Sequence, residues 1–295
     1  MNILDRYSYV PNPEEMGRAL EQLASNLDTF ASEQVYKDCF SMMDLTTLKT
    51  DDTPASVAKL VNKVNAFQDA YPQWPLPASV CVYSNFAATV AQERKCDFNI
   101  TVVSACFPSS QSFLEVKLKE CEMAVEQGAD EVDIVLALSK FLAEDYDGAA
   151  EEIRQVRACI DAVAARQNRK VHLKVILETG LLRTPEKIAQ ASFLAMEAGA
   201  DFIKTSTGKV DVNATPAAAY VMCECIQRFY QKTGKKIGFK PAGGISSAAD
   251  ALCYYSIVSS ILGKEWLDKE YFRFGVSRVA NNILSAVEEK TVSYF

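Results

Sequence analysis

The chain has 295 residues, of which 49% are hydrophobic and 23% charged, a composition typical of a globular protein with one large domain or two small ones. The formal net charge of −7, without a dense run of Lys and Arg, argues against a nucleic-acid-binding or anionic membrane-binding surface and favours a small polar substrate. No apolar run approaches membrane-spanning length and the first residues do not resemble a secretory leader, so we expect a cytoplasmic protein.

The first predicted element is a helix at residues 13–32, where Met16, Leu20 and Leu23 recur at helical spacing. We expect residues 1–37 to form a helical extension packed on the main domain, with a dimer contact as the alternative use of this helix. The remaining residues, 38–295, are predicted to form a single domain.

Eight short apolar runs follow the extension and are predicted to be strands. They lie at residues 39–45, 79–83, 99–106, 131–136, 171–178, 202–206, 237–240 and 271–275. The stretches between them are amphipathic, and a final helix is predicted at 282–289 before a tail at 290–295. Strands that alternate with helices eight times and are mostly apolar predict a parallel sheet closed as a (β/α)8 barrel. A doubly wound open sheet is the structural alternative.

Four pairs of residues mark where helices are predicted to begin. Thr184-Pro185 and Thr215-Pro216 each combine a capping residue with a proline, and the helices that follow are expected to stop near Gly199 and Gly234. Ser112 with Glu115, and Ser247 with Asp250, resemble capping boxes.

The number and spacing of cysteines and histidines limit the kinds of catalytic and metal site that the chain can form. The nine cysteines are scattered without a CxxC pair, which argues against a disulfide framework or a zinc knuckle and indicates a reducing compartment. The only histidine, His172, lies in the apolar run 171–177, where we interpret it as a strand residue. A Ser-His-Asp hydrolase is therefore hard to build and a His-rich zinc site impossible. We expect no metal and no cofactor.

Two lysines lie where predicted strands give way to Gly-rich loops, Lys204 and Lys240. They are one strand–loop–helix unit apart, which places them on neighbouring strands at the mouth of a barrel, and Asp133 lies about two units before Lys204. Two buried ammonium groups side by side lower the pKa of an amine, and a neutral lysine attacks a carbonyl to form a Schiff base. The alternative is that each lysine lies at the surface or in a salt bridge.

The glycine-rich loops have their own prediction. Gly243 and Gly244 follow the seventh strand, and Gly275 with Ser277 follows the eighth. These loops are the usual phosphate position of (β/α)8 barrels, because backbone N–H groups and a helix start converge there. Ordinary turns are the alternative interpretation.

At this level of detail the sequence resembles the deoxyribose-phosphate aldolase family over nearly all of the chain after about residue 38. The similar segments are MDLTTL at 43–48, VCVY at 80–83, GADEVDIV at 128–135, KVILETG at 174–180, DFIKTSTGK at 201–209, VNAT at 212–215, GFKPAGG at 238–244 and FRFG at 272–275. The resemblance implies a class I aldolase that reversibly cleaves 2-deoxy-D-ribose 5-phosphate into acetaldehyde and D-glyceraldehyde 3-phosphate, in deoxyribonucleoside catabolism.

The resemblance also implies roles for individual residues. Lys204 matches the Schiff-base lysine, Lys240 the lysine that perturbs it, and Asp133 the carboxylate of the proton-transfer system. The expected substrate- and phosphate-binding residues are Thr46, Thr205, Gly208, Lys209, Gly243, Gly244, Gly275, Ser277 and Arg278.

Two positions depart from the family pattern. Ser246 stands where an arginine is frequent, and Arg278 stands where a serine is frequent. We hypothesise that the phosphate-facing cation has moved from one loop to the other, the alternative being weaker phosphate selectivity. Tyr294 near the chain end is a possible proton relay, or simply frayed chain. Cys81 is interpreted as a packing residue whose strand could present a thiol to aldehydes.

Three further possibilities stay open from the sequence. A possible homodimer is expected from the extra helix. A non-catalytic phosphate- or protein-binding barrel and a transaldolase-like Schiff-base enzyme are the alternative functions, since a fold does not establish an activity.

Overall fold

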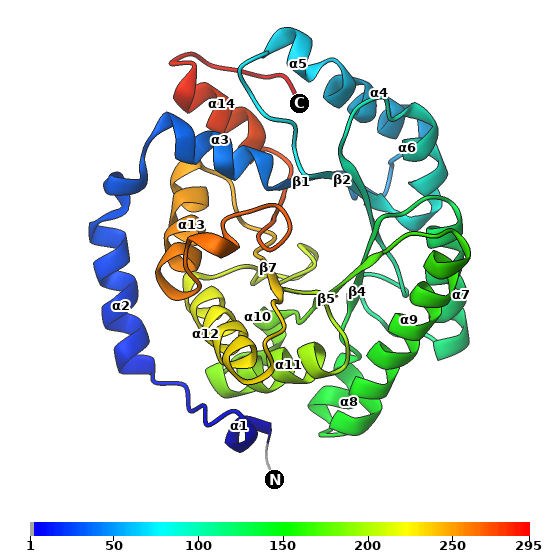
Figure 1. Ribbon diagram of the computed structural model, residues 1–295, viewed down its shortest axis with the longest axis vertical. Coiled ribbons are helices and arrows are strands. Elements are labelled where there is room, and N and C mark those ends of the chain that lie inside the picture. The colour runs from blue at the N-terminus through cyan, green and yellow to red at the C-terminus, as the bar shows by residue number, and fades with distance from the viewer. Residues whose placement is uncertain (1–2) are drawn as a thin grey trace.

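The computed structural model describes residues 3–295 and contains a barrel of eight parallel strands surrounded by helices (Figure 1). The strands are β1 (Met43–Thr46), β2 (Ser79–Tyr83), β3 (Asn99–Val103), β4 (Glu131–Val135), β5 (His172–Ile176), β6 (Phe202–Lys204), β7 (Gly238–Lys240) and β8 (Phe274–Val276). Their order is β7-β6-β5-β4-β3-β2-β1-β8, and every pair is parallel.

Hydrogen bonds between β7 and the β8 region close the barrel. Phe239 bridges to Phe272 and Ala242 to Gly275, and the Gly275 N–H donates to the Pro241 carbonyl at 2.9 Å. The sheet therefore has no long free edge, which confirms the predicted (β/α)8 barrel and rules out the doubly wound open sheet.

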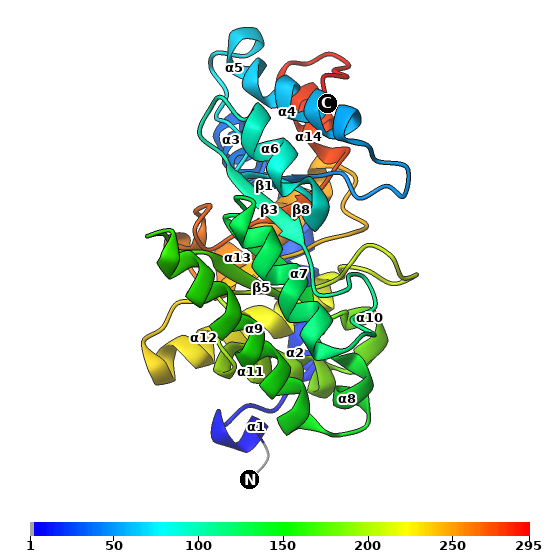
Figure 2. The same cartoon turned by 90° about the vertical axis from the view of Figure 1, so that its right-hand side faces the viewer.

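The helices cover the outside of the barrel, and the first helix and the C-terminal tail lie at opposite ends of the molecule (Figure 2). They are α1 (Ile3–Arg6), α2 (Pro13–Ser25), α3 (Glu33–Ser41), α4 (Pro54–Asn65), α5 (Phe67–Ala70), α6 (Ala87–Glu93), α7 (Leu114–Glu126), α8 (Leu138–Leu142), α9 (Tyr146–Arg166), α10 (Thr179–Leu182), α11 (Pro185–Glu197), α12 (Pro216–Thr233), α13 (Ala248–Ile261) and α14 (Val279–Val287). Short 3-10 turns occur at Leu27–Phe30, Ser84–Phe86 and Lys264–Trp266.

The N-terminal segment is more broken than predicted. The helix expected at 13–32 ends at Ser25, is followed by the 3-10 turn, and is succeeded by α3, which runs across the expected boundary between residues 37 and 38. Asn26, a weak helix former, caps the end of α2, and Ser32 starts α3 by accepting from the Val35 N–H. Helix α2 packs against α12 and α13 on the outside of the barrel.

Most predicted helix starts are correct. Thr184 and Thr215 cap α11 and α12 with prolines at the first helical position, and Ser247 forms a capping box with Asp250 at α13. Ser112 does not cap a helix: α7 begins at Leu114 without a side-chain cap, and the Ser112 N–H donates to the Ser110 carbonyl in the preceding turn. A local sequence pattern could not reveal that turn.

Several predicted strands are longer than the observed ones. The first apolar run divides, with 39–41 in α3 and the strand beginning at Met43. The third and fifth strands end at Val103 and Ile176, and β8 begins only at Phe274. Most residues just beyond these limits are buried, and single backbone hydrogen bonds still join some of them to neighbouring strands, such as Ser104 N–H to the Asp133 carbonyl, but regular strand pairing has ended. Hydrophobicity alone therefore overestimates strand length. The last helix likewise spans Val279–Val287 rather than 282–289.

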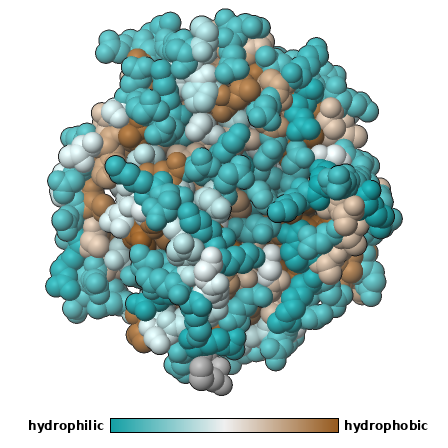
Figure 3. Space-filling view, viewed as in Figure 1, coloured by the Kyte–Doolittle hydropathy of each residue, from teal (hydrophilic) through white to brown (hydrophobic). Residues whose placement is uncertain are grey.

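Burial in the barrel is not purely apolar. All five residues of β4 are buried, including Glu131 and Asp133. Much of the face shown in Figure 3 is hydrophilic, with hydrophobic residues in small scattered groups. Within residues 3–295, the helices include none with the length and apolar character needed to cross a bilayer.

Candidate active site

The two lysines predicted at the barrel mouth lie side by side. Lys204 ends β6 and Lys240 ends β7, and they are direct partners in the register of the two strands. Lys204 is 3% exposed and Lys240 fully buried, so neither is an ordinary surface lysine. The spacing in the sequence therefore gives the correct placement.

Asp133 on β4 joins these lysines to a third one. Its Oδ2 accepts from Lys204 Nζ at 2.9 Å and from Lys240 Nζ at 2.8 Å. Its Oδ1 accepts from Lys174 Nζ on β5 at 3.0 Å. Strand alternation thus points Asp133 into the barrel, and Lys174, which lies in the middle of β5 and is fully buried, occupies the barrel interior rather than the mouth.

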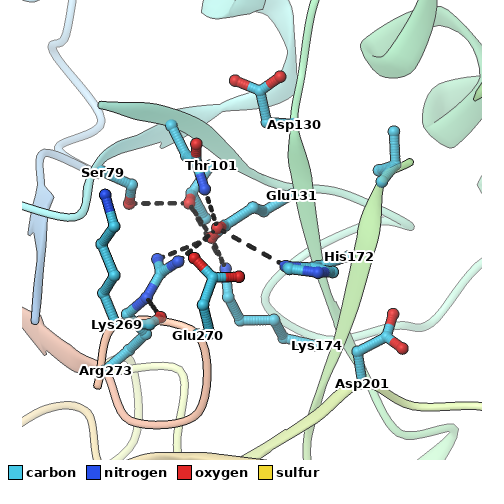
Figure 4. A network of polar contacts seen from close by, with 12 residues as sticks. Ser79, Thr101, Asp130, Glu131, His172, Lys174, Asp201, Lys269, Glu270 and Arg273 are labelled. Carbon is cyan, nitrogen blue, oxygen red and sulfur yellow. Dashed lines mark hydrogen bonds and ion pairs between the residues drawn. The ribbon is translucent and has the colours of Figure 1, made fainter. Parts of the chain in front are cut away.

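A second group of charged side chains lies around Glu131, which Arg273 and Lys174 contact (Figure 4). Arg273 donates to Asp44 at 2.7 Å and to the two Glu131 oxygens at 3.0 and 2.7 Å. Glu131 also pairs with Lys174, and Asp44 Oδ2 lies 2.5 Å from Lys240 Nζ. We call Asp44, Glu131, Lys174 and Arg273 the floor network; all four are fully buried.

Sequence reasoning gave no role to Asp44, Glu131 or Arg273. Each lies in a segment that carries the family resemblance, at 43–48, 128–135 and 272–275. A charged residue inside an apolar run could have indicated a buried ion pair, because Asp, Glu and Arg are almost never fully buried unless paired.

The charges of the whole cluster do not balance. Its contacting members comprise four cations and three carboxylates, namely Lys174, Lys204, Lys240, Arg273, Asp44, Glu131 and Asp133. Excess positive charge is costly in a buried site, so the cation with the fewest carboxylate contacts is the one that loses its proton. Lys204 contacts one carboxylate, whereas Lys240 contacts two.

The pKa shifts follow this difference. Burial lowers the pKa of Lys204, Asp133 only partly offsets that effect, and Lys240 lowers it further. Burial also acts to lower the pKa of Lys240, but Asp133 and Asp44 outweigh it and raise that pKa above its ordinary value. The two neighbouring lysines therefore differ in protonation: Lys204 is the better source of a neutral amine, and Lys240 stays protonated as a lasting cation.

Three predicted binding residues have identifiable partners. Thr205 links the ends of β6 and β7, since its Oγ1 accepts from the Ala242 N–H at 3.0 Å. Thr46 Oγ1 donates to the Asp44 carbonyl at 2.8 Å. Lys209 Nζ donates to the Leu48 carbonyl at 2.6 Å, so this side chain joins the β6–α12 loop to the β1–α4 loop.

The glycines serve different purposes. Gly208, Gly243 and Gly244 have φ of 80°, 75° and 76°, in the region that favours glycine. Gly275 has no such backbone requirement, but a Cβ there would lie 2.6 Å from the Ala242 Cβ and 3.1 Å from the Lys240 Cε. A glycine at 275 is what lets the barrel close beside Lys240.

Thr46, Ser277 and Arg278 line one pocket of about 460 Å³ between the β1–α4 loop, α4 and α14. Lys49, Lys59 and Lys63 line it as well, and Asp52 is the one acidic side chain among the lining residues. The pocket is therefore locally cationic in an acidic protein. Ser246, by contrast, is committed to the cap of α13, where its N–H donates to Asp250 at 2.9 Å.

Tyr294 makes its contacts with residues other than Lys204 and Lys240 in this structure. Its hydroxyl donates to the Lys63 carbonyl at 2.9 Å, and its ring packs against Phe67 and Tyr71. Asn281 holds the backbone of Tyr294 and Phe295. Because these hydrogen bonds and ring contacts hold the tail, it is not frayed. A proton relay by Tyr294 stays a prediction that would require the tail to leave this position.

Cys81 on β2 is fully buried within electrostatic reach of Lys240 and Asp133, and burial raises the pKa of its thiol. That environment favours a protonated packing residue. Among residues 3–295, no group of three or more His, Cys, Asp or Glu side chains is arranged to hold a metal ion.

A barrel that carries a buried lysine of lowered pKa between a carboxylate and a lasting cation has the design of a class I aldolase. The sequence comparisons agree. The family model described as DeoC/LacD family aldolase matches residues 39–253, and the chain belongs to this family.

Individual relatives are similar over most of their length. The deoxyribose-phosphate aldolase of Homo sapiens is 42% identical over 255 residues, covering 82% of this chain and 77% of the relative. That of Bos taurus is 40% identical over 253 residues with the same two coverages. Among solved structures, the tetrameric deoxyribose phosphate aldolase from Aeropyrum pernix is 22% identical, with a TM-score of 0.65 over 93% of this chain and 98% of that one, which supports the fold.

Proposed function

We propose that this protein is a deoxyribose-phosphate aldolase, which reversibly cleaves 2-deoxy-D-ribose 5-phosphate to D-glyceraldehyde 3-phosphate and acetaldehyde. The observation that carries the proposal is the unequal pair at the barrel mouth: Lys204 with a lowered pKa, beside Lys240 with a raised one. The family and the names of its relatives supply the substrate class.

The reaction begins at Lys204. Its neutral Nζ attacks the C1 carbonyl of the open-chain sugar, and loss of water leaves a protonated Schiff base. This iminium withdraws electrons, so removal of the C3 hydroxyl proton lets the C2–C3 bond break. D-glyceraldehyde 3-phosphate leaves, and the two remaining carbons stay on Lys204 as an enamine. Protonation at C2 and hydrolysis then release acetaldehyde and the free amine.

Asp133 is placed to move the protons, with Lys240 beside it and a water as the expected link to substrate. Burial opposes its ionisation, but Lys174, Lys204 and Lys240 together hold its pKa well below the usual range. An Asp133 surrounded by three ammonium groups is a poor base. When Lys204 gives up its proton, Asp133 loses one of these cations and becomes more basic, which couples formation of the nucleophile to activation of the base.

The phosphate is proposed to lie between the Gly243-Gly244 loop and the Ser277-Arg278 turn. The cationic pocket beside Arg278 supports this placement, as does the commitment of Ser246 to a helix cap. Lys209 reaches from the β6–α12 loop to the Leu48 carbonyl, next to Thr47 and Lys49 of that pocket, which supports a role for this loop as well. A cytoplasmic location and a homodimer stay predictions from the sequence.

Trapping the intermediate tests the proposal directly. Acetaldehyde and borohydride should convert the Schiff base into a stable secondary amine, and peptide mapping should find the added two carbons on Lys204. Lys119, an exposed lysine that pairs with Glu122, is the internal control and should stay unlabelled. Labelling elsewhere, or none at all, would defeat the proposed mechanism.

A further inference from the structure

Glu178 is a buried carboxylate that the reaction described above does not use. It follows β5 by two residues and is 2% exposed. No ion pair to Glu178 is formed within the described chain, residues 3–295. Burial raises its pKa, and Lys204 is the charged group that acts in the opposite direction. Burying a carboxylate without an ion-pair partner is costly, so contacts that compensate for this cost are expected around Glu178.

The backbone at Glu178 is unusual too. Its φ and ψ are 55° and 58°, a left-handed conformation that is disfavoured for residues other than glycine. Such a conformation persists where surrounding contacts impose it, often at functional sites. Here the adjoining Thr179 N–H donates to the Thr205 carbonyl at 2.9 Å, which fastens this turn to the end of β6.

Both oxygens of the Glu178 carboxylate accept hydrogen bonds from one residue of the β6–α12 loop. Oε1 accepts from the Thr207 N–H at 3.2 Å, and Oε2 accepts from the Thr207 hydroxyl at 2.5 Å. The Thr207 Oγ1 in turn accepts from the Lys209 N–H at 3.0 Å. This chain of hydrogen bonds fixes the backbone on both sides of Gly208.

We propose that Glu178 is a positioning residue for the phosphate end of the substrate. It acts through Thr207 on the backbone of Gly208 and Lys209, and it does not touch the reacting carbons. The inference rests on the proposed function for the identity of the substrate. A carboxylate suits this task because it accepts on both oxygens, whereas an amide would present a donor to one of the two Thr207 groups.

The experiment compares Glu178→Gln with wild type on phosphorylated and unphosphorylated 2-deoxyribose. Loss of one charge-assisted hydrogen bond should raise KM for the phosphorylated sugar on the order of tenfold, with kcat within about threefold. The kcat/KM for the unphosphorylated sugar should change by less than about threefold. Thr207→Val should reproduce this split, and Thr207→Ser, which keeps the hydroxyl, should restore wild-type KM.

Glu120→Gln is the matched control, because Glu120 on α7 also accepts two hydrogen bonds, from Cys106 N–H in the β3–α7 loop at 2.8 Å and from Ser84 Oγ in the turn after β2 at 2.7 Å. It should give no difference between the two sugars. An equal loss on both sugars in Glu178→Gln, or an unchanged KM, overturns the inference. If that variant does not fold, Thr207→Val decides in the same way. Wild-type protein that fails to cleave the phosphorylated sugar defeats the proposed function and this inference with it.

Discussion

The floor and the mouth of this barrel use the same residue types in opposite ways. In the floor network, Arg273 spans two carboxylates and Lys174 contacts three, so each cation there has more than one counter-charge. At the mouth, Lys204 shares one carboxylate with two other lysines. A cation with several carboxylate partners stays protonated, whereas Lys204, which has one shared carboxylate, loses its proton more easily. The floor network therefore has a structural role, and the mouth supplies the reactive amine.

The largest expected effect comes from removing the group that can lose its proton. Lys204→Arg keeps the positive charge but supplies no neutral amine, since the guanidinium stays protonated. We expect kcat to fall on the order of 10⁴-fold or more and borohydride trapping to vanish. Steady-state cleavage and mass spectrometry measure both. Lys119→Arg at the surface should behave like wild type; substantial turnover by Lys204→Arg would contradict the assignment.

Lys240→Met tests the lasting cation at the mouth. Without it, the pKa of Lys204 rises, because Lys240 repels the Lys204 ammonium and shares its carboxylate. A smaller fraction of Lys204 is then neutral at any given pH, so the rising limb of the pH–rate profile should move to higher pH. We expect kcat at neutral pH to fall about 10²- to 10⁴-fold. A profile that stays in place, or moves to lower pH, would count against the electrostatic role.

Arg273→Met probes the floor instead. It leaves Asp44 and Glu131 with less compensation, which should lower the free energy of unfolding by about 3–5 kcal/mol. Denaturant unfolding measures it. Arg154→Met removes an exposed pair with Glu151 and should cost less than about 1 kcal/mol. Equal small losses in the two variants would show that the floor is not the supporting layer described here.

The smallest effect is expected at the edge of the mouth. Arg278→Ala should raise KM for 2-deoxyribose 5-phosphate by about tenfold, the usual scale for one charge-assisted contact. Activity on the unphosphorylated sugar should stay near wild type. A matching loss on both sugars would remove Arg278 from phosphate binding and favour weaker phosphate selectivity as the meaning of Ser246.

The sequence was sufficient for the barrel and for the placement of its lysines, because the repeat of strand and helix fixes which residues end neighbouring strands. It was not sufficient for the floor network. Arg273 reaches Asp44 and Glu131 only because closure of the barrel sets β8 beside β1 and brings β4 within reach across the interior. Strand ends were misjudged for a different reason, since burial continues beyond the point where regular strand pairing ends.

The absence of a side chain at Gly275 also limits how this enzyme can be redesigned. The seam between β7 and β8 has no spare volume, because even a methyl group there would press on Ala242 and on the stem of Lys240. Substitutions meant to admit bulkier aldehydes should therefore avoid the seam. The side next to α4 offers more freedom, because Lys49 and Ser56 are exposed there and line an open pocket.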